Sequence, residues 1–228
     1  MALYVVATPI GNLKDITLRA LEVLRAVDCI VAEDTRVTKK LLSRYEISKP
    51  VLSFHAHSGK GAIGKIIALL EDGKDVACVV DAGTPSVSDP GSFLIREIVR
   101  ILPDVSIIPI PGPSALTAAL SVAGITDSAF LFLGFPPAKK GRQSFFKEVV
   151  ASKYPVVLYE SPHRIKRTLE DLCEVGLSRF EALLIKEISK VYETQLRMSI
   201  DDIRKKIFEE KNVRGEFVLV INKNLPKQ

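Results

Sequence analysis

The chain has 228 residues, 47% of them hydrophobic and 26% charged, with a formal net charge of +5. This composition is ordinary for a soluble globular protein with a sizeable core. No segment reaches the roughly 18 uncharged apolar residues that a membrane span needs, and the N-terminal MALYVVATPIGN has no basic region before its short apolar run. These features argue against a membrane protein or a secretory signal and predict a cytoplasmic location.

The excess positive charge is unevenly distributed along the chain. Residues 1–118 carry 13 Lys and Arg against 13 Asp and Glu, so the whole excess lies in residues 119–228. A polyanion such as RNA would be attracted to the second half. The three cysteines, Cys29, Cys78 and Cys173, are widely spaced in apolar surroundings, which predicts buried thiols rather than disulfides or a metal cluster.

Apolar runs rich in β-branched residues alternate with helical patterns along the chain. In the first half the expected strands are 3–7, 29–32, 51–54, 76–80 and 105–110, and the expected helices are 17–28, 62–70, 91–101 and 114–123. In the second half the expected strands are 130–133, 156–159, 183–185 and 217–221, and the expected helices are 143–151, 163–174 and 199–210. This alternation predicts an α/β protein of two domains, residues 1–118 and 119–228, each with a mainly parallel or mixed sheet flanked by helices.

The segment HSGKGAIGKI, residues 57–66, raises the question of a nucleotide site. A phosphate loop needs a hydroxyl after its lysine, and Ile66 has none. A dinucleotide fingerprint should follow its strand at once, whereas four residues, His55 to Ser58, separate the glycines from the preceding run. We therefore interpret this segment as a basic loop that precedes a helix.

Three expected strands of the first half end in turns that combine glycine and proline. The turns are ATPIGN at 7–12, DAGTPSVSDPG at 81–91 and IPGPSA at 110–115. In open α/β sheets, ligands bind beyond the carboxyl ends of the strands. Such turns expose backbone amide and carbonyl groups at close range, so the sequence predicts a slot that binds a small molecule mainly through the backbone.

Six motifs in order carry a resemblance to a known family: TPIGNL at 8–13, AEDTR at 32–36, DAGTPSVSDPG at 81–91, PGPSA at 111–115, YESPHR at 159–164 and RGEFVLVI at 214–221. Together they resemble the ribosomal RNA small-subunit methyltransferase I family, which has the tetrapyrrole methylase fold. The resemblance runs from about residue 3 to 221. It implies an enzyme that uses S-adenosylmethionine to methylate the ribose 2′-hydroxyl of a cytidine in small-subunit ribosomal RNA. It also implies a homodimer with the cofactor in the cleft between the two domains, acting on ribosomal RNA or on the assembled small subunit.

Carried onto this chain, the resemblance places S-adenosylmethionine at the strand ends of both halves. The residues expected to bind it are Thr8, Pro9, Gly11, Asp81, Ala82, Gly83, Thr84, Pro85, Ser88, Pro111, Gly112, Ser114, Ala115, Tyr159 and Glu160. One departure lies at 55–59, where the family typically has HEHNE and this chain has HAHSG. His55 and His57 alternate on one face; they are too few for a metal site and are expected to contact substrate.

Methylation of a ribose hydroxyl benefits from a general base, and carboxylates at strand ends are the candidates. They are Glu33, Asp34, Asp81, Glu160 and Glu187. Among these, Asp34, with Glu33 beside it, is expected to be the base. Arg36 would either keep Asp34 ionised or hold an RNA phosphate. The competing interpretation is that Asp34 only caps a helix that begins near Thr35.

The segment PPAKKGR at 136–142 combines turn residues with three cations, Lys139, Lys140 and Arg142. It is suited to contact with RNA phosphates, although a solvated loop is the default interpretation. Two other functions remain open: a methyltransferase of the same fold that acts on a tetrapyrrole, and a non-catalytic RNA-binding protein.

Overall fold

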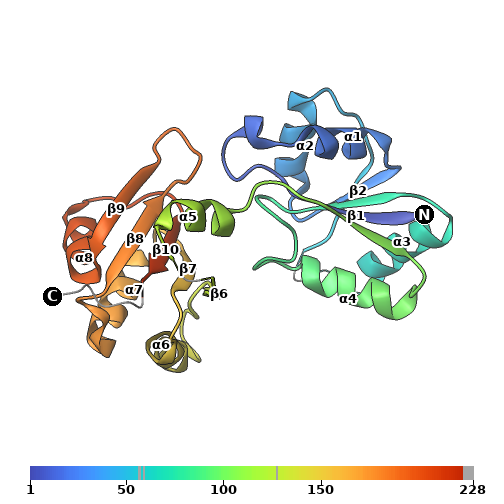
Figure 1. The fold of residues 1–228 in the computed structure, drawn as a ribbon. Helices are drawn as coiled ribbons and strands as arrows, with labels where there is room; N and C mark the ends of the chain where they lie inside the picture. The colour runs from blue at the N-terminus through green and yellow to red at the C-terminus, as the bar shows by residue number, and fades with distance from the viewer. Residues whose placement is uncertain (56–57, 59, 127, 223–228) are drawn as a thin grey trace. The chain divides into compact units, whose positions relative to one another are not determined.

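The computed structural model of the chain describes residues 1–55, 58, 60–126 and 128–222, with the side chain of residue 60 excepted. The chain divides into two compact units, Met1–Ser114 and Ala115–Gln228. The division predicted from the sequence, at 118/119, lies inside the helix α5 (Ala115–Ala123). The two-part α/β organisation is confirmed (Figure 1).

The first unit is an open parallel sheet with the strand order β3-β2-β4-β1-β5. Its strands are β1 (Ala2–Val6), β2 (Cys29–Ala32), β3 (Val51–Ser53), β4 (Val76–Val79) and β5 (Ser106–Ile110). Its helices are the 3-10 turn η1 (Leu13–Asp15), α1 (Leu18–Ala26), α2 (Thr35–Arg44), α3 (Lys60–Glu71) and α4 (Gly91–Ile101). Every strand expected in this half is present.

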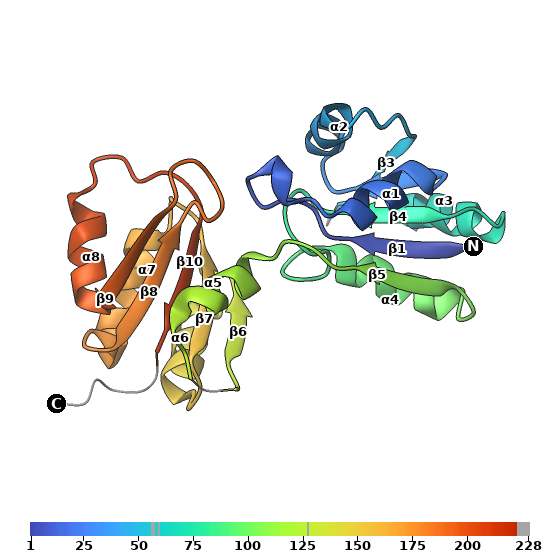
Figure 2. The same cartoon turned by 45° about the horizontal axis from the view of Figure 1, so that its top comes forward.

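Helices cover both faces of this sheet, and the alternation of side chains along the strands explains why. Ile30 and Ala32 pack in one apolar cluster with α1 and α2, whereas Val31 packs in another with α3 and α4. Successive side chains of a strand point to opposite faces, so an uninterrupted apolar run is buried on both sides. Figure 2 shows the two helical layers around β1 and β4.

The second unit is a mixed sheet with the order β6-β7-β10-β8-β9, in which β6 and β7 run parallel and the other neighbours run antiparallel. Its strands are β6 (Leu131–Gly134), β7 (Val156–Glu160), β8 (Glu181–Lys186), β9 (Thr194–Ser199) and β10 (Phe217–Ile221). Besides α5, its helices are α6 (Arg142–Ala151), α7 (Ile165–Leu172), the π-helical turn η2 (Cys173–Leu177) and α8 (Ile200–Glu209). The strand β9 was not predicted.

Three helices of this unit, α6, α7 and α8, pack on one face of the sheet, and α5 packs on the other. Among the described residues, no helix is long and apolar enough to cross a membrane. The three cysteines are unpaired; Cys29 and Cys78 are buried, and burial raises the pKa of Cys78 to about 12.

Candidate functional site

Four neighbouring parallel strands of the first unit, in the order β2-β4-β1-β5, end at one edge of the sheet. The turns that follow them contain the AEDTR, DAGTP, TPIG and PGPS segments of the sequence motifs. Because the strands are adjacent, the sheet itself brings these four segments together. We call this group of turns the strand-end site.

The turns after β1 and β4 are joined backbone to backbone. The amide of Thr8 donates to the carbonyl of Gly83 at 2.9 Å, and the amide of Gly83 donates to the carbonyl of Thr8 at 3.0 Å. The Thr8 hydroxyl, almost fully buried, donates to the carbonyl of Val80 at 3.0 Å. Thr8 therefore fixes the turn. Gly83 has a φ of +87°, a region that favours glycine.

The turn after β5 packs equally tightly against its neighbours. A Cβ atom on Gly112 would lie 3.0 Å from the Cβ atom of Ala7, which is closer than real Cβ contacts normally come. The hydroxyl of Thr84 donates to the carbonyl of Pro113 at 3.2 Å. The turns after β1, β4 and β5 thus form one connected surface, held by backbone and small side chains.

The segment between Thr84 and α4 is organised by one carboxylate. Asp89 accepts hydrogen bonds from the amides of Ser86 at 2.9 Å, Val87 at 3.1 Å and Gly91 at 2.7 Å. Ser86 and Ser88 have φ values of 75° and 68°, which are strained for non-glycine residues. The hydroxyl oxygen of Ser86 is buried and has no hydrogen-bond partner among the described residues. A buried polar atom without a partner, on a strained turn, is typical of a ligand site.

Three carboxylates lie at the ends of β2 and β4. The amide of Asp34 donates to Oδ1 of Asp81 at 3.0 Å, which links the two strand ends. Burial raises the pKa of Glu33, and the neighbouring charges of Asp81 and Asp89 raise it further. Burial also raises the pKa of Asp81. Glu33 and Asp81 are therefore better proton acceptors than carboxylates with the ordinary pKa.

Asp34 has the opposite character. Its Oδ1 accepts the amide of Arg36 at 2.8 Å and so caps α2, and its Oδ2 lies 2.6 Å from Nη2 of Arg36. The hydrogen bonds from Arg36 lower the pKa of Asp34 to about 2. The structure thus gives Asp34 the capping role that was the competing interpretation of the sequence. Arg36 is exposed but is paired with Asp34.

Most of the glycine-rich segment is helical. The helix α3 begins at Lys60, two residues earlier than the sequence predicted, so Gly61 and Gly64 lie in its first turns and the expected loop does not extend past residue 59. A Cβ atom on either glycine would meet nothing within 4 Å, so neither glycine is needed for close packing. His55 precedes this helix, and its amide donates to the hydroxyl of Ser58 at 2.8 Å. His57 lies outside the described residues.

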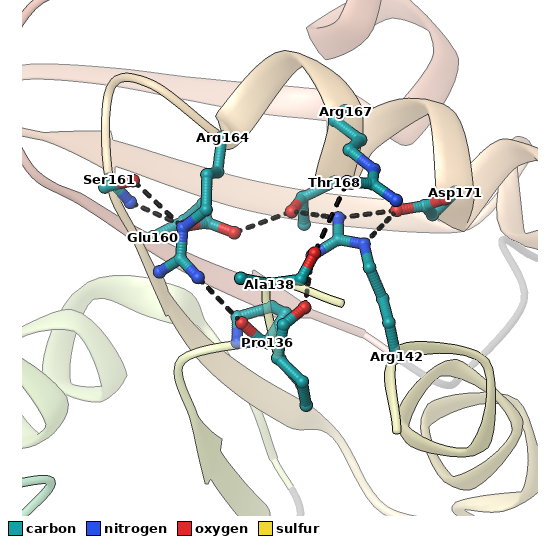
Figure 3. Close-up of polar contacts among 10 residues, drawn as sticks. Pro136, Ala138, Arg142, Glu160, Ser161, Arg164, Arg167, Thr168 and Asp171 are labelled. Atoms are coloured by element: carbon teal, nitrogen blue, oxygen red, sulfur yellow. Dashed lines mark hydrogen bonds and ion pairs between the residues drawn. The ribbon is translucent and has the colours of Figure 1, made fainter. Parts of the chain in front are cut away.

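In the second unit, Lys139 and Lys140 are exposed, as a phosphate-binding role requires. Arg142 is not available for that role, because its side chain is only 5% exposed and its Nε donates to Oδ2 of Asp171 at 2.7 Å. Figure 3 shows the guanidinium among the side chains of α7. The expected contact between Arg142 and RNA therefore has to be withdrawn.

Tyr159 and Glu160 end β7. Tyr159 packs edge-on against Phe132 and Phe135. The Glu160 carboxylate is buried and fully engaged: its Oε1 accepts the amide of Ser161 at 2.7 Å and its Oε2 accepts the hydroxyl of Thr168 at 2.6 Å. Its Oε1 also lies 3.1 Å from Nε of Arg164. Any contact of Glu160 with a ligand would have to use its backbone.

The remaining predicted residues lie where the motifs placed them. Pro9 and Gly11 follow β1, Ala82 and Pro85 flank Gly83 and Thr84, and Pro111 follows β5. The PGPSA motif crosses the boundary between the units, since Ser114 ends the first and Ala115 begins the second. Among the described residues, no group of three or more His, Cys, Asp or Glu side chains could hold a metal ion.

Comparison with known proteins places the chain in a family. Residues 2–204 match the family described as Tetrapyrrole (Corrin/Porphyrin) Methylases. The chain belongs to this family. It is 48% identical over 221 residues to the "Ribosomal RNA small subunit methyltransferase I" of Neisseria meningitidis serogroup A, covering 96% of this chain and 75% of that one. It is 44% identical to the protein of that name from Thermotoga maritima, covering 96% and 97%. The resemblance inferred from the six motifs is confirmed.

Solved structures of more distant proteins have the same fold as this chain. A diphthine synthase aligns with a TM-score of 0.75 at 18% identity, over 99% of this chain and 91% of that one. A uroporphyrin-III C-methyltransferase from Thermus thermophilus, complexed with S-adenyl homocysteine, aligns with a TM-score of 0.67 at 15% identity, over 98% of both chains. At these identities the likeness establishes the fold alone.

The strand-end site has the features that S-adenosylmethionine requires. Its turns are joined by their own backbone hydrogen bonds into one surface, and Gly83 and Gly112 keep side chains away from it. The buried Ser86 hydroxyl, which has no partner among the described residues, offers a further polar contact. The carboxylates Glu33 and Asp81 complement a cationic sulfonium by their charge. The chemistry of these residues therefore fits the cofactor.

Proposed function

We propose that this protein transfers a methyl group from S-adenosylmethionine to the ribose 2′-hydroxyl of a cytidine in small-subunit ribosomal RNA. The observation that carries the proposal is the 48% identity, over 96% of the chain, to a relative named for small-subunit ribosomal RNA methylation. The cytidine and the 2′-hydroxyl come from the motif resemblance. The exposed Lys139 and Lys140 support an RNA substrate.

When bound, S-adenosylmethionine supplies an electrophilic methyl group on a sulfonium. The residues of the strand-end site then bind and orient: the turns at Thr8, Gly83 and Gly112 form the surface, and Asp89 holds the segment that presents Ser86. A rigid surface of this kind aligns the reacting groups and excludes water, which is most of what an in-line displacement requires of a protein.

We infer that Glu33, rather than Asp34, accepts the proton of the ribose hydroxyl. A general base works best when its pKa lies near the working pH. Burial and the charges of Asp81 and Asp89 raise the pKa of Glu33, whereas Arg36 lowers the pKa of Asp34 to about 2. Asp34 and Arg36 then act as positioning residues, which cap α2 and tie the end of β2 to Asp81.

Incubation with labelled cofactor tests the function. Purified small ribosomal subunits, naked small-subunit RNA and a porphyrinogen are offered separately, and the modified nucleoside is identified after digestion. We expect label in a 2′-O-methylcytidine from RNA or subunits and none in the porphyrinogen. Label only in the porphyrinogen would assign the protein to tetrapyrrole chemistry. Tight RNA binding without label at saturating cofactor would make it an RNA-binding protein.

The resemblance also implies that the enzyme is a homodimer that acts in the cytoplasm, where ribosomes are assembled. Light scattering of the purified chain should give twice the monomer mass, which is 25.1 kDa. A monomeric mass at micromolar concentration would contradict this.

A further inference from the structure

Three successive carbonyl groups in the second unit each accept a hydrogen bond from a different arginine. Arg164 Nη1 donates to the carbonyl of Pro136 at 3.0 Å, and Arg142 Nη1 donates to the carbonyl of Pro137 at 3.0 Å. Arg167 Nη1 donates to the carbonyl of Ala138 at 3.4 Å. We call Arg142, Arg164 and Arg167 the arginine clamp; Figure 3 shows it around Pro136 and Ala138.

The segment 136–138 can form few backbone hydrogen bonds of its own. Pro136 and Pro137 have no amide hydrogen, so only their carbonyls can hold them in place. A side chain with several donors in a fixed plane can bind such a carbonyl and its own anchor at the same time, and this is the geometry of a guanidinium.

Two of the three arginines are themselves anchored by carboxylates. Arg142 is bound through Nε to Asp171 at 2.7 Å, and Arg164 Nε lies 3.1 Å from Oε1 of Glu160. The Thr168 hydroxyl connects the two pairs, because it accepts from Arg142 Nη2 at 2.9 Å and donates to Oε2 of Glu160 at 2.6 Å.

This network is charge-balanced where it is buried. Glu160 and Thr168 are 1% and 0% exposed, and Arg142 is 5% exposed. The two carboxylates offset the charges of Arg142 and Arg164, so the buried part adds no net positive charge for RNA. The arginines of these two pairs therefore act on the loop rather than on the substrate.

The clamp ends immediately before the two exposed lysines of the loop. Lys139 and Lys140 follow Ala138, and the amide of Arg142 closes the turn by donating to the carbonyl of Lys139 at 3.3 Å. Gly141, with a φ of +83°, reverses the chain there. Both ends of the lysine pair are thus held by bonds that involve Arg142.

We propose that the arginine clamp is a positioning device for RNA binding: it fixes the backbone of residues 136–138 so that Lys139 and Lys140 meet two phosphates in one preset geometry. A loop whose backbone is already fixed binds RNA without the entropic cost of ordering that backbone on binding. This inference rests on the proposed function, since it requires an RNA substrate. It assigns Arg142 and Thr168 to positioning rather than to contact.

The test measures RNA affinity against salt concentration for Arg142→Lys and Thr168→Val. Arg142→Lys keeps the charge, but an ammonium cannot serve Asp171, Thr168 and Pro137 in one plane. Thr168→Ser is the matched control that keeps the bridging hydroxyl.

The expected result is a weaker dependence of RNA affinity on salt. With single-stranded RNA, the slope of log affinity against log salt falls by roughly 0.7 for each phosphate that the protein no longer neutralises. We expect both clamp variants to flatten the slope by about 1 and to weaken RNA binding at least about fivefold at low salt. Thr168→Ser should match the wild type, and cofactor affinity should stay within about twofold in all of them.

The double variant Lys139→Ala/Lys140→Ala separates the clamp from the RNA role of the loop. If this variant keeps the wild-type slope, the lysines do not bind phosphate, and both the clamp proposal and that part of the proposed function are wrong. If it flattens the slope while Arg142→Lys and Thr168→Val do not, only the clamp proposal is wrong. On the lysine-free background, Arg142→Lys should cause no further loss of RNA affinity. A further loss there would mean that Arg142 affects RNA binding by a route other than the two lysines, and would contradict the clamp proposal.

Discussion

The two units of this protein build polar sites at the ends of their strands by opposite means. In the first unit, the strand-end site consists of backbone groups and small side chains, joined by the mutual hydrogen bonds of Thr8 and Gly83. In the second, the buried carboxylate of Glu160 at the end of β7 and the buried guanidinium of Arg142 at the start of α6 are bridged by the Thr168 hydroxyl. The first arrangement depends on the absence of large side chains, and the second depends on the presence of particular charged side chains. Substitutions should therefore damage the two sites in different ways.

The buried network should be the more sensitive to loss of a single group. Arg142→Met removes a buried cation and leaves Asp171 and Thr168 without it. Breaking a fully buried ion pair from one side typically costs about 3–5 kcal/mol, but the Asp171 side chain is 24% exposed and water can solvate it, so we expect a smaller drop of about 2–3 kcal/mol in the free energy of unfolding. Denaturant unfolding measures it, with Lys140→Met as the control at an exposed neighbour, which should change stability by less than about 0.5 kcal/mol. Equal losses in the two variants would mean that burial of Arg142 is not what matters.

The strand-end site should lose function through added volume. Gly83→Val places a branched side chain where an added Cβ atom would lie 3.5 Å from Cγ2 of Ile10, at a φ of +87°. We expect cofactor affinity to fall by about 10²-fold or more, because valine is strained there and fills the surface between the turns. Gly73→Val is the control in calorimetric titration, since Gly73 has a φ of +78° but nothing within 4 Å. An equal loss of affinity at Gly73 would show that strain, not the site, is responsible.

The carboxylates after β2 sharpen the comparison within the first unit. We expect Glu33→Gln to lower the single-turnover methylation rate by about 10²-fold with cofactor affinity intact. We expect Asp34→Asn to stay within about threefold of the wild-type rate, because asparagine caps a helix equally well.

The pH dependence of the reaction tests the same assignment. The base must be deprotonated, so the wild-type rate should fall as the pH drops through the pKa of Glu33. That pKa is raised by burial and by Asp81 and Asp89, so the fall should occur above the ordinary value of about 4.3. A Glu33→Gln enzyme with the same acid limb would exclude Glu33 as the base.

The smallest effect is expected at the glycine-rich segment. Gly61 lies in the first turns of α3 with open space around its Cβ position. Gly61→Ala should therefore leave cofactor affinity within a few fold and raise the free energy of unfolding by about 0.5–1 kcal/mol, because alanine loses less backbone freedom in a helix. Calorimetric titration and thermal unfolding check the two parts. A large loss of cofactor affinity would mean that this segment contributes to cofactor binding.

The features that the sequence predicted best are those encoded locally. Three strand ends of the first unit were found because glycine and proline follow the apolar run, as at Gly83 and Pro111. The strand β9 was missed because its half-buried Leu196 and Met198 alternate with polar residues at the edge of the sheet, which leaves only a weak apolar pattern. Arg142 was misjudged because its partners Thr168 and Asp171 lie 26 and 29 residues further along the chain, and nothing local distinguishes a buried arginine from a solvated one.

The position of β1 also constrains how the chain acquires its structure during synthesis. The strand β1 lies between β4 and β5, so its pairing partners in the sheet begin at Val76 and Ser106. The strand β1 must therefore wait until more than 70 further residues have been made before it gains any neighbour in the sheet. Parallel pairing over such separations forms slowly, because a long loop must close before any contact offsets its entropy. The apolar segment Leu3–Val6 is consequently the part of the nascent chain that depends longest on protection from aggregation.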